Sequence, residues 1–140
     1  MMTKEIKTAT SVEQSRRLIE LGIDRATADM HYARCSKDWR GQETDCEFGH
    51  VVFGNPDTHY ADYPSANFQQ WEKIPAWSLT ALLALIPAEC NLHSFNTENG
   101  KVYRMETLYM LNHTKSYDNP VDAAFELVCW MYENERMDEI

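Results

Sequence analysis

Long apolar runs, glycine-rich loops and the usual catalytic motifs are missing from this sequence of 140 residues. The longest apolar run covers residues 81–88 and includes Pro87, whereas a membrane-spanning helix needs roughly 18 apolar residues. The chain has five glycines and no glycine-rich loop of the kind that nucleotide-dependent enzymes use to hold phosphate. It also has no paired-histidine zinc motif, no nucleophile elbow and no calcium loop. We therefore expect no membrane contact and no cofactor.

Basic residues are scarce after residue 40. Residues 1–40 carry eight basic and six acidic side chains, whereas residues 41–140 carry five basic and sixteen acidic ones, and the segment from Gly41 to Gln70 has no Lys or Arg. Binding to nucleic acid or to an anionic membrane depends on Lys and Arg, so we expect neither. The charge is compatible with a partner protein that has a basic surface, and equally with ordinary solubility.

The cysteines and the first residues indicate a cellular compartment. Cys35, Cys46, Cys90 and Cys129 lie far apart and form no Cys-x-x-Cys pair, which favours four reduced thiols over a disulfide framework. Residues 1–10 are polar and are not followed by the apolar stretch of a signal peptide. We therefore expect a cytoplasmic protein.

Capping residues predict the first helices. Thr10 and Glu13 have the spacing of a capping box, which predicts a helix over residues 11–21. Gly22 follows it, in the place where a helix commonly ends in the left-handed conformation. Asp24 is placed to cap a second, very short helix that reaches Asp29.

Two further helices have clear signals. Ser78 can cap a helix that Pro87 ends, with an apolar stripe at helical spacing formed by Leu79, Leu82, Leu83 and Ile86. Asn119 and Pro120 are typical of a helix start, and the residues after them are apolar on nearly all sides. Such a helix is usually central and buried.

Strand signals are weaker. We predict strands at residues 30–33 and 46–53, followed by a turn at 54–57 and a long loop from Thr58 to Gln70.

A hairpin is predicted further along the chain. Asn99-Gly100 favours a type I′ turn between strands at residues 91–95 and 101–111. In the second strand, the side that carries Tyr103, Met105 and Tyr109 should be the inner face, and Arg104 and Glu106 lie on the other side.

Together these patterns predict an α+β fold. It has a small antiparallel sheet of three to four strands packed against three main helices, which are N-terminal, leucine-rich in the middle, and buried at the C-terminus. Residues 1–140 should form a single domain, with residues 1–9 and 135–140 flexible.

A zinc site is a weak hypothesis. Cys35, Cys46, His50 and His59 have the right chemistry for zinc, but only Cys46 and His50 have the close spacing of ligands in a structural site. We favour the interpretation that these residues are incidental, and therefore predict no metal.

Catalytic residues are equally hard to assign. Asp57, His59, Asp62 and Ser65 include the residue types of a hydrolytic triad, but nothing around Ser65 marks it as an activated nucleophile. We therefore predict no catalytic residues and favour a protein that is not an enzyme.

Aromatic residues gather in the basic-free part of the chain. Tyrosine and tryptophan are favoured at protein interfaces because they bury a large area with little loss of entropy. We therefore predict a partner-binding surface that includes Tyr60, Asp62, Tyr63, Phe68 and Trp71. The alternative interpretation is that these aromatic residues cover the sheet and pack against the leucine-rich helix.

Four stretches of the sequence carry a resemblance: residues 10–24, 27–30, 74–83 and 117–131. They resemble a group of short uncharacterised proteins of gut Bacteroidales genomes, often found in prophages or other mobile elements. The resemblance implies a bacterial cytoplasmic setting and an accessory role in a mobile element, and it brings no catalytic residue with it.

Function is therefore narrowed to three classes. The leading hypothesis is a non-enzymatic accessory or protein-interaction protein that acts through residues 41–72. The alternatives are a small enzyme of unrecognised type and a zinc-stabilised module. The oligomeric state is left open by the sequence.

Overall fold

The chain folds into helices and two separate antiparallel sheets. The computed structural model describes residues 7–57, 70–87, 90–106 and 115–134. The elements, in chain order, are α1 (Val12–Glu20), η1 (Arg25–Thr27), β1 (Met30–Lys37), β2 (Val52–Phe53), β3 (Gln70–Ala76), α2 (Leu79–Ala84), β4 (Asn91–Thr97), β5 (Gly100–Glu106) and α3 (Pro120–Glu133). The α+β class is thus confirmed. The strands, however, form a three-stranded sheet in the order β2-β1-β3 and a two-stranded sheet of β4 and β5, rather than one sheet.

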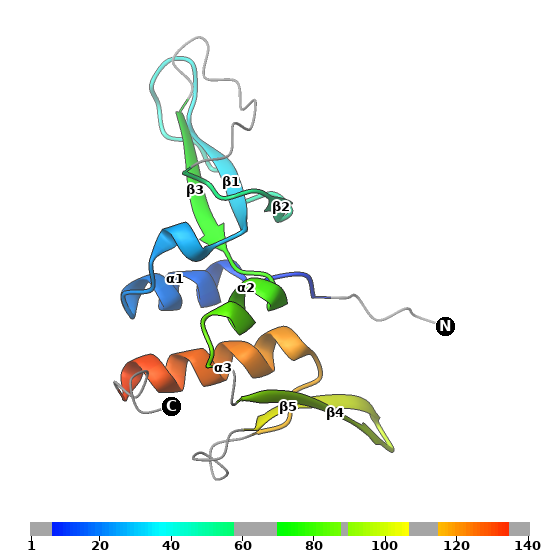
Figure 1. Cartoon of the computed structure of the whole chain (residues 1–140). Helices are drawn as coiled ribbons and strands as arrows, with labels where there is room; N and C mark the ends of the chain where they lie inside the picture. The colour runs from blue at the N-terminus through cyan, green and yellow to red at the C-terminus, as the bar shows by residue number, and fades with distance from the viewer. Residues whose placement is uncertain (1–6, 58–69, 88–89, 107–114, 135–140) are drawn as a thin grey trace.

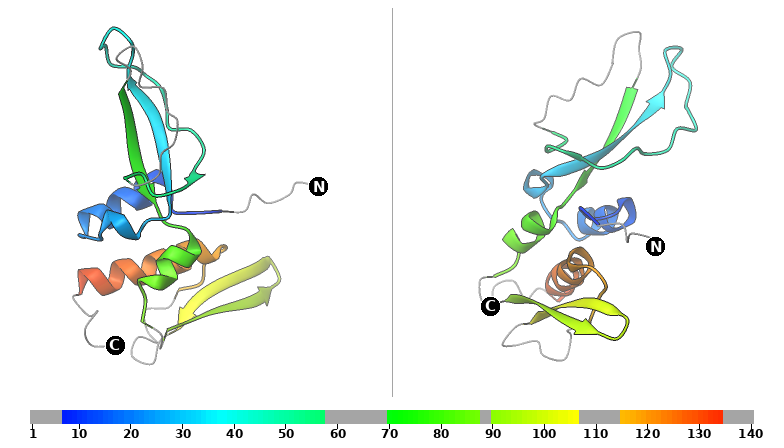
Figure 2. Two further views of the ribbon diagram at one scale, coloured as in Figure 1. Left: turned by 45° about the horizontal axis from the view of Figure 1, so that its top comes forward. Right: turned by 90° about the vertical axis from the view of Figure 1, so that its right-hand side faces the viewer.

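The two sheets lie on opposite sides of the helices. In Figure 1, β1 and β3 project upward from α1 and α2 as a long arm, while the β4–β5 hairpin lies below α3. The further views in Figure 2 show the same separation. No helix within the described residues is long and apolar enough to cross a membrane.

The first helix begins one residue later than the capping signal indicated. Ser11, not Thr10, is the N-cap: its hydroxyl accepts a hydrogen bond from the Gln14 amide at 3.1 Å, and the Gln14 side chain accepts one from the Ser11 amide at 3.0 Å. The predicted Thr10–Glu13 capping box is therefore wrong. Thr10 is buried instead, where its hydroxyl accepts a hydrogen bond from the Trp77 amide at 3.0 Å.

The chain leaves α1 as predicted. Gly22 has a φ angle of 90°, a conformation that a residue with a Cβ rarely adopts. The carboxylate of Asp24 accepts a hydrogen bond from the Ala26 amide at 2.9 Å and caps η1. This predicted short helix is a single 3-10 turn, which ends before Asp29.

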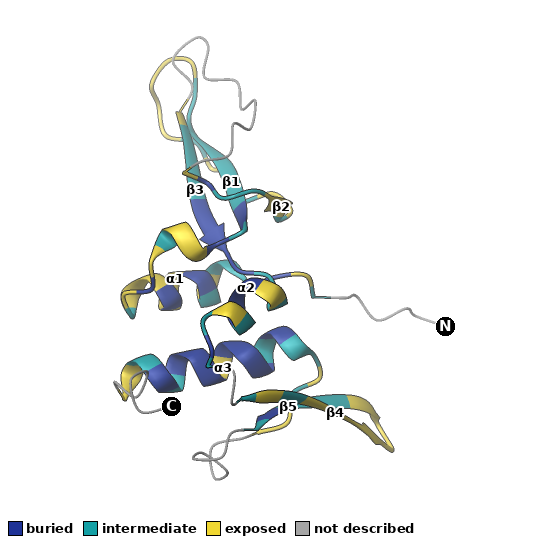
Figure 3. Ribbon diagram, viewed as in Figure 1, coloured by how far each residue is buried: buried dark blue, intermediate teal, exposed yellow. Residues whose placement is uncertain are grey.

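The main core lies between α2 and α3 (Figure 3). Asn119 caps α3 and Pro120 begins it, which confirms the predicted start. Burial of α3 on most sides is also confirmed, since its buried residues are Val121, Ala123, Ala124, Phe125, Leu127, Val128, Cys129 and Met131. Trp77 is fully buried beside them, and its indole N–H donates to the Thr27 hydroxyl at 2.9 Å. Met105 of β5 closes the core from the hairpin side.

The β4–β5 hairpin has a different turn from the expected one. Thr97 pairs with Gly100, so the turn residues are Glu98 and Asn99 rather than Asn99 and Gly100. Gly100 is the first residue of β5, and its φ angle is 119°. The predicted inner face is confirmed, because Met105 is buried and Tyr103 packs against the core. Residues 107–111 of the predicted strand lie outside the described residues.

The arm differs most from expectation. β1 continues to Lys37 and pairs along its whole length with β3, a strand that the sequence did not predict. The predicted strand at 46–53 is reduced to Val52–Phe53. Gln70, placed in a loop by the sequence, begins β3, and the rest of that predicted loop lies outside the described residues.

Candidate interaction surface

Most of the predicted partner-binding residues lie outside the described residues. These are Tyr60, Asp62, Tyr63 and Phe68. Trp71 is described: it is half-buried on β3, where it pairs with Cys35 of β1. The predicted surface is therefore represented in the structure by one of its five residues.

The candidate zinc ligands do not come together in the described part of the chain. Cys46 and His50 are exposed, and the Cys35 thiol donates to the carbonyl of Lys37 at 3.1 Å. Among the described residues, no group of three or more His, Cys, Asp and Glu side chains could hold a metal ion. His59 lies outside them.

Asp57, considered above for catalysis, has a structural contact. Its carboxylate accepts two hydrogen bonds from the Arg25 guanidinium, at 3.1 and 3.2 Å. The hydrogen bonding and charge of Arg25 hold the pKa of Asp57 below its ordinary value. The contact joins η1 to the turn after β2, and both side chains are largely exposed.

A segment that runs antiparallel along the outer edge of β1 forms the most distinctive surface of the arm. We call residues 43–53 the edge segment. It pairs with β1 from Glu43 opposite Lys37 to Phe53 opposite Met30. Its eleven residues span the eight residues of β1, so three extra residues must bulge out of the ladder. This mismatch explains why only two of its residues form a regular strand.

The first half of the edge segment presents carboxylates to solvent. Glu43, Asp45 and Glu47 alternate with other residues and are all exposed. Thr44 anchors this half, because its amide donates to the Ser36 carbonyl at 3.1 Å and its hydroxyl donates to the carbonyl of Cys35.

Arg34 fastens the middle of the edge segment to the sheet. Its guanidinium donates to Glu72 at 2.8 Å and to the carbonyl of Cys46 at 3.3 Å, and it lies 5.6 Å from the centre of the Phe48 ring. The hydrogen bond that Arg34 donates to Glu72 and the charge of that carboxylate raise the pKa of Arg34. The bulged part of the segment is therefore held by the Arg34 side chain together with one backbone hydrogen bond, which the Gly49 amide donates to the Ala33 carbonyl at 3.2 Å.

The second half of the edge segment is apolar and exposed. Phe53 is 75% exposed and Val52 is 39% exposed. Behind them, the fully buried His31 is held by a hydrogen bond between its Nδ1 and the carbonyl of Gly54 at 2.8 Å. β2 thus presents two apolar side chains to water, at the other end of the edge segment from Glu43.

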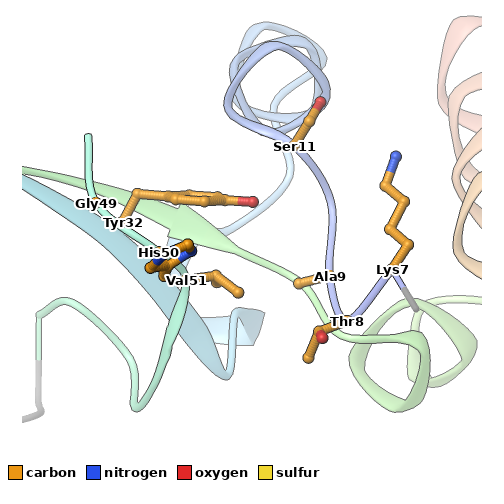
Figure 4. A pocket seen from close by; sticks show the side chains of 8 residues that line it. All are labelled: Lys7, Thr8, Ala9, Ser11, Tyr32, Gly49, His50 and Val51. Carbon is orange, nitrogen blue, oxygen red and sulfur yellow. The ribbon is translucent and has the colours of Figure 1, made fainter. Parts of the chain in front are cut away.

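A pocket of about 530 Å³ lies between the edge segment and the residues that precede α1. Figure 4 shows its lining: Lys7, Thr8, Ala9, Ser11, Tyr32, Gly49, His50 and Val51. Two of its polar groups are used within the fold, since the Tyr32 hydroxyl donates to the Thr10 carbonyl at 2.8 Å and the Lys7 ammonium donates to Asp122 at 2.6 Å. Burial raises the pKa of Tyr32.

No family model, curated protein or solved structure matches this chain. The edge segment must therefore be judged on its own geometry. Sequence reasoning had located the basic-free region but had placed the site on its aromatic residues. The available signal for the carboxylates was their spacing at every second residue in Glu43-Thr44-Asp45-Cys46-Glu47.

Proposed function

We propose that this protein is a non-enzymatic accessory protein that binds a partner protein with a basic surface through the edge segment. The observation that carries this proposal is the combination, along one edge of β1, of three exposed carboxylates with the exposed Phe53. The sequence has no Lys or Arg between residues 41 and 57, and the basic side chain nearest in register is Lys37, which lies opposite Glu43 on β1.

The two halves of the edge segment contribute differently to binding: the carboxylates to the rate and selectivity of association, and Phe53 to the affinity. Carboxylates two residues apart on extended backbone are roughly 6.5–7 Å apart, a spacing suited to successive basic side chains on a partner. Exposed charges of this kind speed association and select the partner more than they add affinity. Phe53 supplies the complementary part, because a large aromatic side chain that becomes buried is a typical source of binding energy.

The setting of this activity is also part of the proposal. The resemblance to mobile-element proteins of Bacteroidales leads us to propose an accessory role in such an element, in the bacterial cytoplasm. The acidic surface supports a protein partner rather than nucleic acid, because Glu43, Asp45 and Glu47 would repel phosphate.

A photo-crosslinking experiment tests the proposal. A photoreactive amino acid replaces Phe53 in the purified protein, and the matched control carries it in place of Glu98, in the β4–β5 turn away from the arm. Each protein is irradiated in lysate of a gut Bacteroidales host, and crosslinked proteins are identified by mass spectrometry. We expect one protein to be enriched by the probe at residue 53 and not by the probe at residue 98.

Charge reversal provides the decisive control. A variant with Glu43, Asp45 and Glu47 all replaced by Lys should lose the crosslink, and reversing the basic residues of the captured partner should restore it. The proposal is wrong if both probe positions capture the same proteins, or if the triple Lys variant captures the partner as well as the wild type does.

A further inference from the structure

The free edge of β4 lacks the features that usually protect a sheet edge. In the described residues, β4 pairs on one side with β5 and has no strand on its other side. Six of its seven residues are exposed. Edge strands of monomeric proteins are commonly protected by proline, lysine or a bulge, and β4 has none of these. The edge strand β3 of the other sheet, by contrast, contains Lys73 and Pro75.

The register of the hairpin shows which backbone groups of β4 face this edge. Tyr103 of β5 exchanges two hydrogen bonds with Tyr117, at 2.7 and 2.8 Å, on the side of β5 away from β4. In an antiparallel ladder, residues directly opposite one another point their backbone groups either toward each other or both away. Because Ser94 is the partner of Tyr103, the N–H and C=O of Ser94 point to the free edge. Because outward-facing and inward-facing residues alternate along the strand, the backbone groups of Leu92 and Asn96 also point to the free edge.

These outward groups are related by symmetry about Ser94. If a second β4 is laid antiparallel to the first, with Ser94 opposite Ser94, then Leu92 pairs with Asn96 and Asn91 with Thr97. The outward groups of Leu92, Ser94 and Asn96 then pair with those of the same three residues in the other copy. The strand Asn91–Thr97 matches itself over its whole length.

Charge also favours a second copy as the occupant. The chain has a net charge of −9, yet β4 contains no Lys, Arg, Asp or Glu. A strand that pairs with its own copy brings identical side chains near one another, and like charges placed directly opposite are destabilising. A strand without such charges is therefore suited to a twofold pairing, in which every contact is repeated by symmetry.

The side chains on the outer face complete the contact. The rings of His93 and Phe95 stack with their centres 6.3 Å apart, and the Arg104 guanidinium lies 4.8 Å from the centre of the Phe95 ring. Glu106 approaches His93 at 3.2 Å. In the symmetric pairing, Phe95 of one copy lies opposite His93 of the other, in the closer type of antiparallel pair. The pairing therefore extends an existing aromatic stack.

We propose that the free edge of β4 pairs with β4 of a second copy of this chain, about a twofold axis through Ser94. The two hairpins then form one four-stranded antiparallel sheet. This addresses the weakness of the β4–β5 sheet, since a two-stranded sheet is only marginally stable by itself.

Substitutions at Ser94 test the pairing, because only at the symmetry axis does a residue face itself. The wild-type chain should change from monomer toward dimer over about 1–300 μM, the range of a modest interface, in sedimentation equilibrium. Ser94→Asp and Ser94→Lys should each weaken the dimer by about tenfold or more, because each places like charges opposite one another. An equal mixture of the two variants should form a heterodimer.

A backbone control separates pairing from folding. Ser94→Pro removes the outward N–H without removing a hydrogen bond to β5 and should be monomeric, whereas Ser94→Ala keeps the N–H and should dimerise like the wild type. Circular dichroism verifies that each variant is folded. A wild type that stays monomeric up to about 300 μM, charge variants that dimerise normally, or a mixture that stays monomeric would each overturn the proposal.

Discussion

Replacing Asp122 by asparagine tests the contact that joins the residues before α1 to the first turn of α3. The Asp122 carboxylate accepts hydrogen bonds from the Lys7 ammonium at 2.6 Å, the Gln14 amide group at 2.8 Å and the Asn119 amide group at 2.7 Å. The side chains of Lys7 and Asp122 are 28% and 27% exposed. This one carboxylate thus connects three separate parts of the chain.

The size of the effect follows from these contacts. A hydrogen bond to a charged group contributes about 1.5–3 kcal/mol, and partial exposure places the Lys7 contact at the low end of that range. The favourable position of a carboxylate in the first turn of a helix adds about 0.3–1 kcal/mol. We therefore expect Asp122→Asn to lower the free energy of unfolding by about 2 kcal/mol at neutral pH, which lowers Tm by roughly 4–8 °C.

The pKa of Asp122 sets the pH range of this effect. Burial acts to raise that pKa, but the hydrogen bonds from Lys7, Gln14 and Asn119 outweigh burial and hold it below the ordinary value of 3.8. Because the folded pKa is the lower one, the ionised carboxylate stabilises the fold fully above the unfolded pKa. This stabilisation is lost as the pH falls through the folded pKa. The difference between wild type and Asp122→Asn should therefore shrink below about pH 4.

Urea unfolding followed by circular dichroism, repeated from neutral pH to about pH 2.5, measures both effects. Glu126→Gln is the matched control, because Glu126 is an exposed carboxylate on the same helix. The reasoning fails if Asp122→Asn costs less than about 0.5 kcal/mol, if Glu126→Gln costs as much, or if the difference stays constant as the pH falls.

Three further outcomes are expected. Burial raises the pKa of Cys129 to about 12, so a thiol reagent at about pH 8 should modify the exposed Cys46 and leave Cys129 unmodified until the protein unfolds, as mass spectrometry would show. Trp77→Ala should lower the free energy of unfolding by about 3–5 kcal/mol in urea, because the indole is fully buried. Gly100→Ala should cost about 1–3 kcal/mol in the same assay. This loss of stability would come from the positive φ angle of residue 100 and not from a steric clash, because an added Cβ meets no atom within 4 Å.

Local signals predicted where the helices begin, although the leucine-rich helix α2 is only six residues long and ends at Ala84, before Pro87. Asn119 and Pro120 mark the start of α3 by chemistry that acts within one turn, and the structure places the helix there. At α1, local signals did not suffice to identify the capping residue. Thr10 and Ser11 are both good caps, and the choice between them depends on Trp77, whose amide binds the Thr10 hydroxyl across 67 residues of sequence. A contact at that distance leaves no local pattern.

Strand pairing could not be predicted in the same way. β3 contains Pro75, which lowers the strand signal, although an edge strand tolerates proline. The edge segment pairs with β1 through a bulged register, and the contacts of Arg34 with Cys46 and of Thr44 with Cys35 that accompany it leave no periodic pattern in the sequence. Sequence reasoning therefore found the acidic region, but the exposure of its carboxylates and of Phe53 became visible only with the fold.

The two proposed surfaces, the edge segment and the free edge of β4, lie at opposite ends of the molecule. This arrangement leads to a prediction that involves both surfaces. The arm and the β4–β5 hairpin lie on opposite sides of the helices (Figure 2), so pairing through β4 leaves the edge segments of both copies open. A dimer would then bind an immobilised, repeated basic partner more tightly than a monomer does, because the second contact is intramolecular. Ser94→Asp should weaken binding of this protein to a dense layer of the crosslinked partner, yet leave its affinity for the same partner free in solution unchanged. If both affinities fell together, the hairpin would have to contribute directly to the partner contact, and the assignment of that contact to the edge segment alone would be wrong.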